Sequence, residues 1–284
     1  MILEPRARRR LFASWLTRAG MAGCAFVLAV ALLGPMLAPY PTDLKDVLGT
    51  GAPIKAAPSF RHPLGTDWHG VDVFSRVIKG ARTSVEIGLA SSAVAVAIGL
   101  FVGLTTGYFG GLYDAAWMRF VDVVLAFPEL LLTILIAATF QPGLMTVFVA
   151  LWMASWAGIA RLIRSLTIGA RKAEYVTAAI ALGASDTRVI VKHLLPNMLP
   201  TLAVIFASRI GVMILAEAAL NFLGLGAPAG TPSWGVMVYY GMDHLSDAPW
   251  CAVAPATAIA LTVLSFNLLG DGVRDALDPR LKQV

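Results

Sequence analysis

The sequence predicts an all-α, polytopic membrane protein with six transmembrane helices. Hydrophobic residues make up 58% of the 284 residues, charged residues make up only 14%, and the mean hydropathy is +0.75. A soluble domain is about 45–50% apolar and about 25% charged, so the excess of apolar side chains must face lipid. Several apolar runs approach or exceed the roughly 20 residues that a helix needs to cross the bilayer core.

Glycine and proline mark the ends of the predicted spans, because both residues interrupt regular structure. Pro142-Gly143 separates the third span from the fourth. Pro196 and Pro200 open the fifth span, since the first turn of a helix tolerates proline, and Pro128 should kink the third. The six predicted spans cover residues 19–37, 84–107, 119–140, 144–163, 198–222 and 250–270.

Lysine and arginine predict the orientation of these spans, because they concentrate on the cytoplasmic side of a membrane. Basic residues cluster at 6–18, 161–192 and 274–282, whereas residues 223–249 contain none. We therefore expect both termini and the loop at 164–197 to be cytoplasmic. The segment at 40–83 carries six basic residues on the opposite side, but its length weakens its effect on topology.

The chain divides into three parts on this basis. Residues 1–83 hold a basic cytoplasmic N-terminus, the first span and an extracytoplasmic segment. Residues 84–273 hold a core of five helices, and residues 274–284 form a cytoplasmic tail.

One part of the extracytoplasmic segment predicts a helix on the membrane surface. Residues 72–82 place Val73 and Val77 on one side and Arg76 and Lys79 on the other. A helix with one apolar face and one basic face is typical of segments that lie in the membrane interface.

The segment between the fourth and fifth spans is polar and carries helix signals. Residues 174–196 read EYVTAAIALGASDTRVIVKHLLP. Residues 177–182 are rich in good helix formers, and Gly183 suits the left-handed turn that ends a helix. Ser185 or Asp186 can cap a following helix. We therefore expect a short helix, a hinge and a second helix that runs into Pro196.

This segment resembles the cytoplasmic EAA loop of ABC-transporter permease subunits, through which a separate ATPase drives the membrane domain. Thr177 stands where the Glu of the triplet is usual, and two alanines follow it. Gly183 and Leu195-Pro196 fall at the spacing of the family.

Three further stretches extend the resemblance. Residues 62–82 (HPLGTDWHGVDVFSRVIKGAR) are similar to the HPLGTDxxGRDVxSRxxxGAR segment of one permease group, and residues 217–235 are similar to its EAxLSFLGLG…PSWG segment. Residues 266–279 (FNLLGDGVRDALDP) match its closing segment. Over residues 62–280 the chain thus resembles the second (C-type) permease of dipeptide, oligopeptide and nickel importers, which implies the type I ABC importer fold.

The resemblance implies a non-catalytic subunit in a bacterial plasma (inner) membrane that forms half of a translocation pathway for di/oligopeptides. The implied partners are a homologous second permease, two ATPase subunits that bind ATP and Mg, an extracytoplasmic substrate-binding protein and membrane lipid. The sequence has no G-x-x-x-x-G-K-[ST] phosphate loop, and we expect this chain to bind no cofactor, metal ion or nucleic acid. The residues expected to couple it to the ATPase are Glu174, Thr177, Ala178, Ala179, Gly183, Ala184, Leu195 and Pro196.

Four ionisable residues fall inside the predicted spans, where charges are expensive and usually face a cavity or a partner. Asp122 and Glu129 are seven residues apart, so we expect them on about one face, near the cytoplasmic start of the third span. Arg209 lies about halfway along the fifth span, where the family usually has apolar residues, and Glu217 points roughly 80° away from it. Either Arg209 pairs with a carboxylate that joins two helices, or it lines the pathway and meets a carboxylate of the substrate.

Several alternatives remain at this stage. The solute could instead be nickel or a metal–chelator complex. An ion-coupled secondary transporter would show inverted repeats and broken midplane helices, and the sequence shows neither.

His62 and His69 flank Asp67, but we interpret these histidines as structural. Two scattered cysteines are too few for a disulfide framework or a metal site.

Overall fold

The computed structural model describes residues 14–42, 53–228 and 230–277. Within these ranges the protein is helical, and its only β-bridge is an isolated one between Thr66 and Asp72. The helices, in chain order, are α2 (Trp15–Leu37), α4 (Val73–Phe109), α5 (Gly111–Leu125), α6 (Glu129–Ala138), α7 (Leu144–Arg171), α8 (Glu174–Ala181), α9 (Asp186–Val189), α10 (Leu195–Phe222), α11 (Trp234–Gly241) and α12 (Trp250–Leu277). A π-helical turn (Ile190–Leu194) joins α9 to α10, and a 3₁₀ turn (Met242–His244) follows α11.

Five helical stretches of the described chain are long and apolar enough to cross a membrane. They are α2, α4, α7, the continuous stretch Asp186–Phe222, and α12. A sixth span is the pair α5 and α6, which are bent by 84° relative to each other. The all-α prediction with six spans is confirmed when this bent pair is counted as one span.

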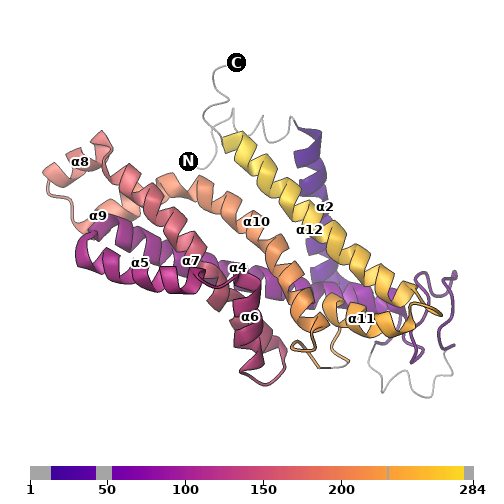
Figure 1. The fold of residues 1–284 in the computed structure, drawn as a ribbon. Helices are drawn as coiled ribbons and strands as arrows, with labels where there is room; N and C mark the ends of the chain where they lie inside the picture. Colours follow the sequence, from indigo (N-terminus) through magenta and orange to yellow (C-terminus); the bar gives the residue numbers. More distant parts are fainter. Residues whose placement is uncertain (1–13, 43–52, 229, 278–284) are drawn as a thin grey trace.

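The bend between α5 and α6 corrects the third predicted span. Residues 119–140 were expected to form one kinked helix, but the helix ends at Leu125 and a new one starts at Glu129, so the two meet at a corner (Figure 1). Pro128 supplies the reason, because proline has no N–H to donate and disfavours helical backbone at the residue before it. Asp122 and Glu129 therefore do not share a helix face.

The helix predicted at 72–82 is present, but it is not a separate helix on the membrane surface. These residues form the start of α4, which continues without interruption to Phe109. Asp72 caps this helix by accepting a hydrogen bond from the Ser75 N–H at 2.8 Å. Residues 82–84 contain no glycine or proline that would end the helix before the predicted second span. Val73 and Ala81 are buried against the rest of the protein.

The packing of α4 against α7 forms the centre of the fold. Gly99, Gly103 and Gly107 recur every four residues along one face of α4. A Cβ atom on Gly103 would lie 2.6 Å from the Ala160 carbonyl oxygen, and one on Gly107 would lie 2.6 Å from the Thr167 Cβ. Small residues at this spacing allow two helix backbones to approach closely, as in many membrane proteins.

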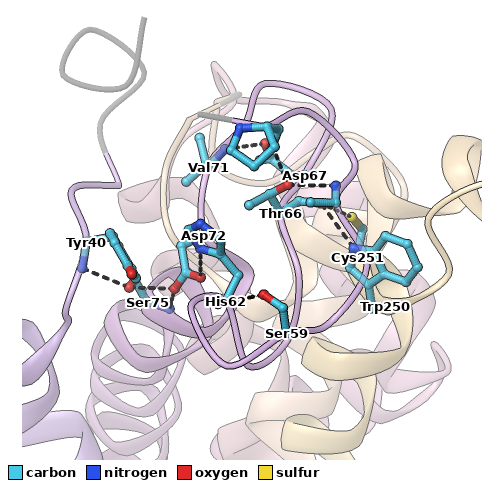
Figure 2. Close-up of polar contacts among 12 residues, drawn as sticks. Tyr40, Ser59, His62, Thr66, Asp67, Val71, Asp72, Ser75, Trp250 and Cys251 are labelled. Carbon is cyan, nitrogen blue, oxygen red and sulfur yellow. Dashed lines mark hydrogen bonds and ion pairs between the residues drawn. The ribbon is translucent and has the colours of Figure 1, made fainter. Parts of the chain in front are cut away.

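The segment ahead of α4, residues 53–72, is an ordered lobe that ties several helices together (Figure 2). The Asp67 carboxylate accepts hydrogen bonds from the N–H groups of His69 and Val71, at 2.8 and 2.9 Å, and pairs with Arg76 at 2.7 Å. His62 Nδ1 lies 2.8 Å from Asp72 Oδ1. The aspartates that neighbour the two histidines thus hold backbone and helix ends in place.

The lobe is also anchored to α12 and to the loop before it. The Trp250 indole N–H at the start of α12 donates to the Thr66 carbonyl at 3.0 Å. Lys55 pairs with Asp247, and this hydrogen bond lowers the pKa of the Asp247 carboxyl. The lobe therefore fixes one end of the helix bundle from outside.

Candidate coupling surface and membrane-depth charges

The predicted short helix and hinge are present at α8. Gly183 has a φ of +80°, in the left-handed region. Its N–H donates to the Ile180 carbonyl at 2.9 Å, and the Ala184 N–H donates to the Ala179 carbonyl at 3.0 Å. These two bonds form the helix-ending pattern that favours glycine at this position. The turn predicted from the sequence is confirmed.

The start of the second helix differs in detail from the prediction. Ser185 occupies the N-cap position, but its side chain makes no capping hydrogen bond. Asp186, in the first turn of α9, instead accepts a hydrogen bond from the Tyr108 hydroxyl at 2.6 Å. The guanidinium carbon of Arg171 lies 5.1 Å from the centre of the Tyr108 ring. The loop is therefore tied to the end of α4 by a contact that the sequence did not reveal.

The surface of α8 presents apolar side chains to the outside. Val176 is fully buried and holds the helix against the protein. Tyr175, Ile180 and Leu182 are exposed, and Leu182 is 88% accessible. Exposed apolar groups that lie close together mark surfaces that bind another protein. Sequence reasoning missed this feature, although an apolar residue just before a helix-ending glycine in a polar loop was an available signal.

The eight predicted coupling residues fall into two groups. Six of them, from Glu174 to Ala184, lie on α8 and its closing turn. Leu195 and Pro196 lie further on, in the first turn of α10. The helix passes Pro196 without a break, because the preceding π-helical turn accommodates a residue that has no N–H. Asn197 Nδ2 donates to the Tyr175 hydroxyl at 2.9 Å and links the two groups.

Arg209 pairs with Glu129, which confirms the expected Arg–carboxylate pair. One guanidinium nitrogen, Nη1, lies 2.7 and 3.1 Å from the two carboxylate oxygens of Glu129. The Ser155 hydroxyl donates to Glu129 Oε1 at 2.7 Å. The guanidinium lies over Gly158, where an added Cβ would be 3.9 Å from Nη2. The pair thus joins three helices, α6, α7 and α10.

The depth of Glu129 corrects the sequence-based placement. Glu129 was expected near the cytoplasmic start of its span, where water is accessible. Glu129 contacts Arg209, which lies near the middle of α10. Arg209 is about 20 Å along the helix axis from either end of α10. The corner between α5 and α6 therefore lies beside the middle of α10, and it is a break that the sequence did not show.

The other two candidate residues have separate partners. Glu217 is fully buried and accepts hydrogen bonds from Ser233 at 2.8 Å, from Ser84 at 3.3 Å and from Asn221. These contacts fasten the loop after α10, and no cation takes part in them. Asp122 pairs with Arg161, and both side chains are half exposed. Of the four candidates, only Arg209 and Glu129 are brought together.

A match to known families accounts for this architecture. Residues 95–283 match the family described as binding-protein-dependent transport system inner membrane component, and residues 6–58 match the N-terminal TM domain of oligopeptide transport permease C. The chain therefore belongs to the inner-membrane permease subunits of ABC importers, of the oligopeptide and glutathione C type. In this family ATP is hydrolysed by a separate subunit.

Glutathione transport system permease proteins GsiD of several bacteria are similar to this chain. The chain is 40% identical over 256 residues to that of Pectobacterium atrosepticum, which covers 90% of this chain and 84% of the relative. It is 40% identical over 259 residues to those of Escherichia coli O157:H7 and Shigella sonnei, with the same coverage. Because the chain belongs to this family, the alternative of an ion-coupled secondary transporter is rejected, although the α5–α6 pair is a broken helix.

Proposed function

We propose that this chain is one of two unlike permease subunits in an importer of short peptides, with the tripeptide glutathione as the leading solute. The observation that carries the proposal is the exposed, closed turn of α8 on a family-typical membrane core. A rigid element held at the surface is what a separate ATPase needs in order to move the membrane domain. The glutathione permeases that resemble this chain support the choice of solute.

The proposed coupling contact consists of α8 and its closing turn. Thr177 and Ala178 are exposed on α8 and Ala179 is half buried. Small side chains there allow a groove of the ATPase to approach the backbone, while Leu182 supplies apolar contact area. In Figure 1, α8 lies toward the same side as the start of α2 and the end of α12, opposite α11. This arrangement supports a cytoplasmic position for both termini and for α8.

The remaining partners follow from the same proposal. A second, homologous permease would complete the pathway, two ATPase subunits would bind ATP and Mg, and an extracytoplasmic binding protein would deliver the solute. The lobe at residues 53–72 and α11 lie at the opposite end from α8 (Figure 1), so they are the surfaces that such a binding protein would meet.

The test is reconstitution of the complete complex in liposomes with its binding protein. We expect ATP-dependent uptake of labelled glutathione, and no ATP hydrolysis by this chain purified alone. Uptake of Ni²⁺ with no uptake of peptides would overturn the choice of solute. Substantial ATP hydrolysis by the isolated chain would overturn the assignment of coupling to a partner.

A further inference from the structure

The corner between α5 and α6 exposes irregular backbone and, with Arg209, two charges beside the middle of the apolar helix α10. Residues 126–128 leave the helical pattern, and Phe127, Leu130 and Leu131 around them are exposed on the described chain. Non-helical backbone at this depth is tolerated where it is covered by protein or lines a water-filled path. In secondary transporters, a different class of membrane protein, broken helices near the midplane commonly form the substrate site.

The two charges at this corner retain unused bonding capacity. The Arg209 guanidinium has five N–H donors, and among residues 14–42, 53–228 and 230–277 its hydrogen-bond partner is Glu129, through Nη1 alone. Its side chain is 21% exposed and that of Glu129 is 42% exposed. In contrast, Glu217 on the same helix is enclosed and bonded by three donors. The Arg209–Glu129 pair is therefore open on one side.

We infer that this pair binds an α-amino-acid head group, in which a free ammonium and a free carboxylate sit on one carbon. The inference rests on the proposed peptide-import function and adds the part of the solute that this chain recognises. The ligand carboxylate meets the unused N–H groups of Arg209, and the ligand ammonium meets the exposed side of the Glu129 carboxylate. Ser155 stays bonded to Glu129 and holds it in position.

The spacing of the charges selects this head group over ordinary peptide ends. The cation and anion of the protein are in direct contact, at 2.7 Å. The matching ligand charges must also be neighbours, so that the four groups alternate in sign. The two ends of an extended tripeptide are roughly 10 Å apart and cannot meet both partners at once.

A γ-linked glutamyl peptide carries such a head group. Its amide bond uses the side-chain carboxyl, so the α-ammonium and the α-carboxylate remain together and free. The α-linked isomer has the same composition and charge, but its α-carboxyl is consumed in the amide. A comparison of these two isomers therefore tests the α-amino-acid head group alone, which is what the Arg209–Glu129 pair is inferred to bind.

The experiment measures uptake of γ-Glu-Cys-Gly and α-Glu-Cys-Gly by the complete complex in liposomes with its binding protein. The test variant is the double substitution Arg209→Gln with Glu129→Gln, which removes both charges and leaves neither one unpaired. We expect its γ-to-α uptake ratio to fall about tenfold relative to wild type, the scale of one hydrogen bond to a charged group. The same binding protein serves both complexes, so its own preference cancels.

A second variant and a control separate binding from structure. Arg209→Lys keeps the charge but lacks the planar, multi-donor group, so we expect normal complex yield with a reduced ratio. The control changes another Arg–Glu pair, Arg82→Gln with Glu86→Gln, which is exposed on α4. It should leave the ratio unchanged.

Each outcome decides the inference. A lower ratio with normal complex yield in both Arg209 variants supports it. An unchanged ratio in a complex that still imports γ-Glu-Cys-Gly overturns this inference alone. Loss of complex yield in both Arg209 variants also overturns it, because the pair would then hold subunits together. A wild-type complex that imports neither tripeptide overturns the proposed function, and this inference with it.

Discussion

The loops after α8 and after α10 begin in the same way, yet only the second folds onto buried polar groups. Gly183 and Gly224 have φ values of +80° and +73°. At each glycine, the N–H donates to the carbonyl three residues earlier, and the following N–H donates to the carbonyl five residues earlier, at 2.9 to 3.0 Å. The two helix ends are therefore closed by the same backbone motif.

The side chains around the two turns differ. The loop after α10 folds back onto buried polar groups: Asn221 bonds the Ala227 N–H at 2.9 Å, and Glu217 bonds Ser233. The loop after α8 is exposed, and its polar side-chain contact to a distant helix is Asp186 to Tyr108. The backbone motif sets the direction of the chain, while the side chains decide whether the loop folds onto buried groups or stays exposed. A loop that docks an ATPase must be exposed.

The largest effect should come from Glu217→Ala. The substitution leaves the hydroxyl donors of Ser84 and Ser233 without their carboxylate acceptor in a buried site, while Asn221 Nδ2 keeps its bond to the Glu217 backbone carbonyl at 3.0 Å. Each such group costs about 1–3 kcal/mol, so we expect a loss on the order of 3 kcal/mol or more. Thermal unfolding and complex yield in detergent are the measurements. Glu217→Gln keeps the shape and most of the acceptors, and it should cost much less. Equal stability of the Ala variant and wild type would show that the loop is not held by this network.

Gly183→Asp should stop transport while leaving the protein in the membrane. A side chain in the left-handed region costs roughly 1 kcal/mol or more, and the new charge lies at the proposed ATPase contact. We expect normal membrane content with uptake and substrate-stimulated ATP hydrolysis both lost. Wild-type uptake by a properly assembled variant would mean that α8 is not the coupling element.

A matched pair of glycine substitutions sharpens the comparison between the two turns. No atom lies within 4 Å of a Cβ added at Gly183 or at Gly224, so alanine introduces backbone strain without crowding. Each variant should lose about 1 kcal/mol of stability. Only Gly183→Ala should alter the ratio of transport to ATP hydrolysis. If both variants change that ratio equally, the two turns do not differ in function.

The smallest effect should come from Tyr108→Phe. The variant removes the hydroxyl that bonds Asp186 but keeps the ring under Arg171. One hydrogen bond contributes about 1 kcal/mol, so we expect a stability change of that size or less and a modest drop in coupling. Faster protease cleavage near residue 186 would report the loosened loop. Tyr113→Phe, whose hydroxyl bonds Thr105 instead, is the control.

Local signals predicted much of this fold. The spans follow from apolar runs, and Gly183 follows from the rule that a helix-ending left-handed turn favours glycine. These features depend on neighbours in sequence, so a sequence is enough to find them. The α5–α6 corner was predicted only as a kink, because the proline indicates a disruption but neighbouring helices set its angle.

Contacts between distant residues were the part that could not be predicted. Glu217 bonds Ser84, which is 133 residues away, and Arg209 bonds Glu129, which is 80 residues away. Both carboxylates look alike in the sequence as charges inside apolar spans. Their different roles depend on which helices surround them. The placement of Glu129 near water failed for the same reason, since the corner carries it to the middle of α10.

The row of glycines between α4 and α7 has a mechanical consequence. Two backbones in such close contact cannot slide past one another without clashes, so α4 and α7 must move as one rigid rod. With 37 residues, α4 is about 55 Å long, nearly twice the thickness of the hydrocarbon core. Tyr108 sits at one end of this rod and the Asp72 cap at the other. A tilt of about 10° around its middle would move each end by roughly 5 Å, given that length. Force applied at α8 can thus reach the lobe on the opposite side without any change within the helices.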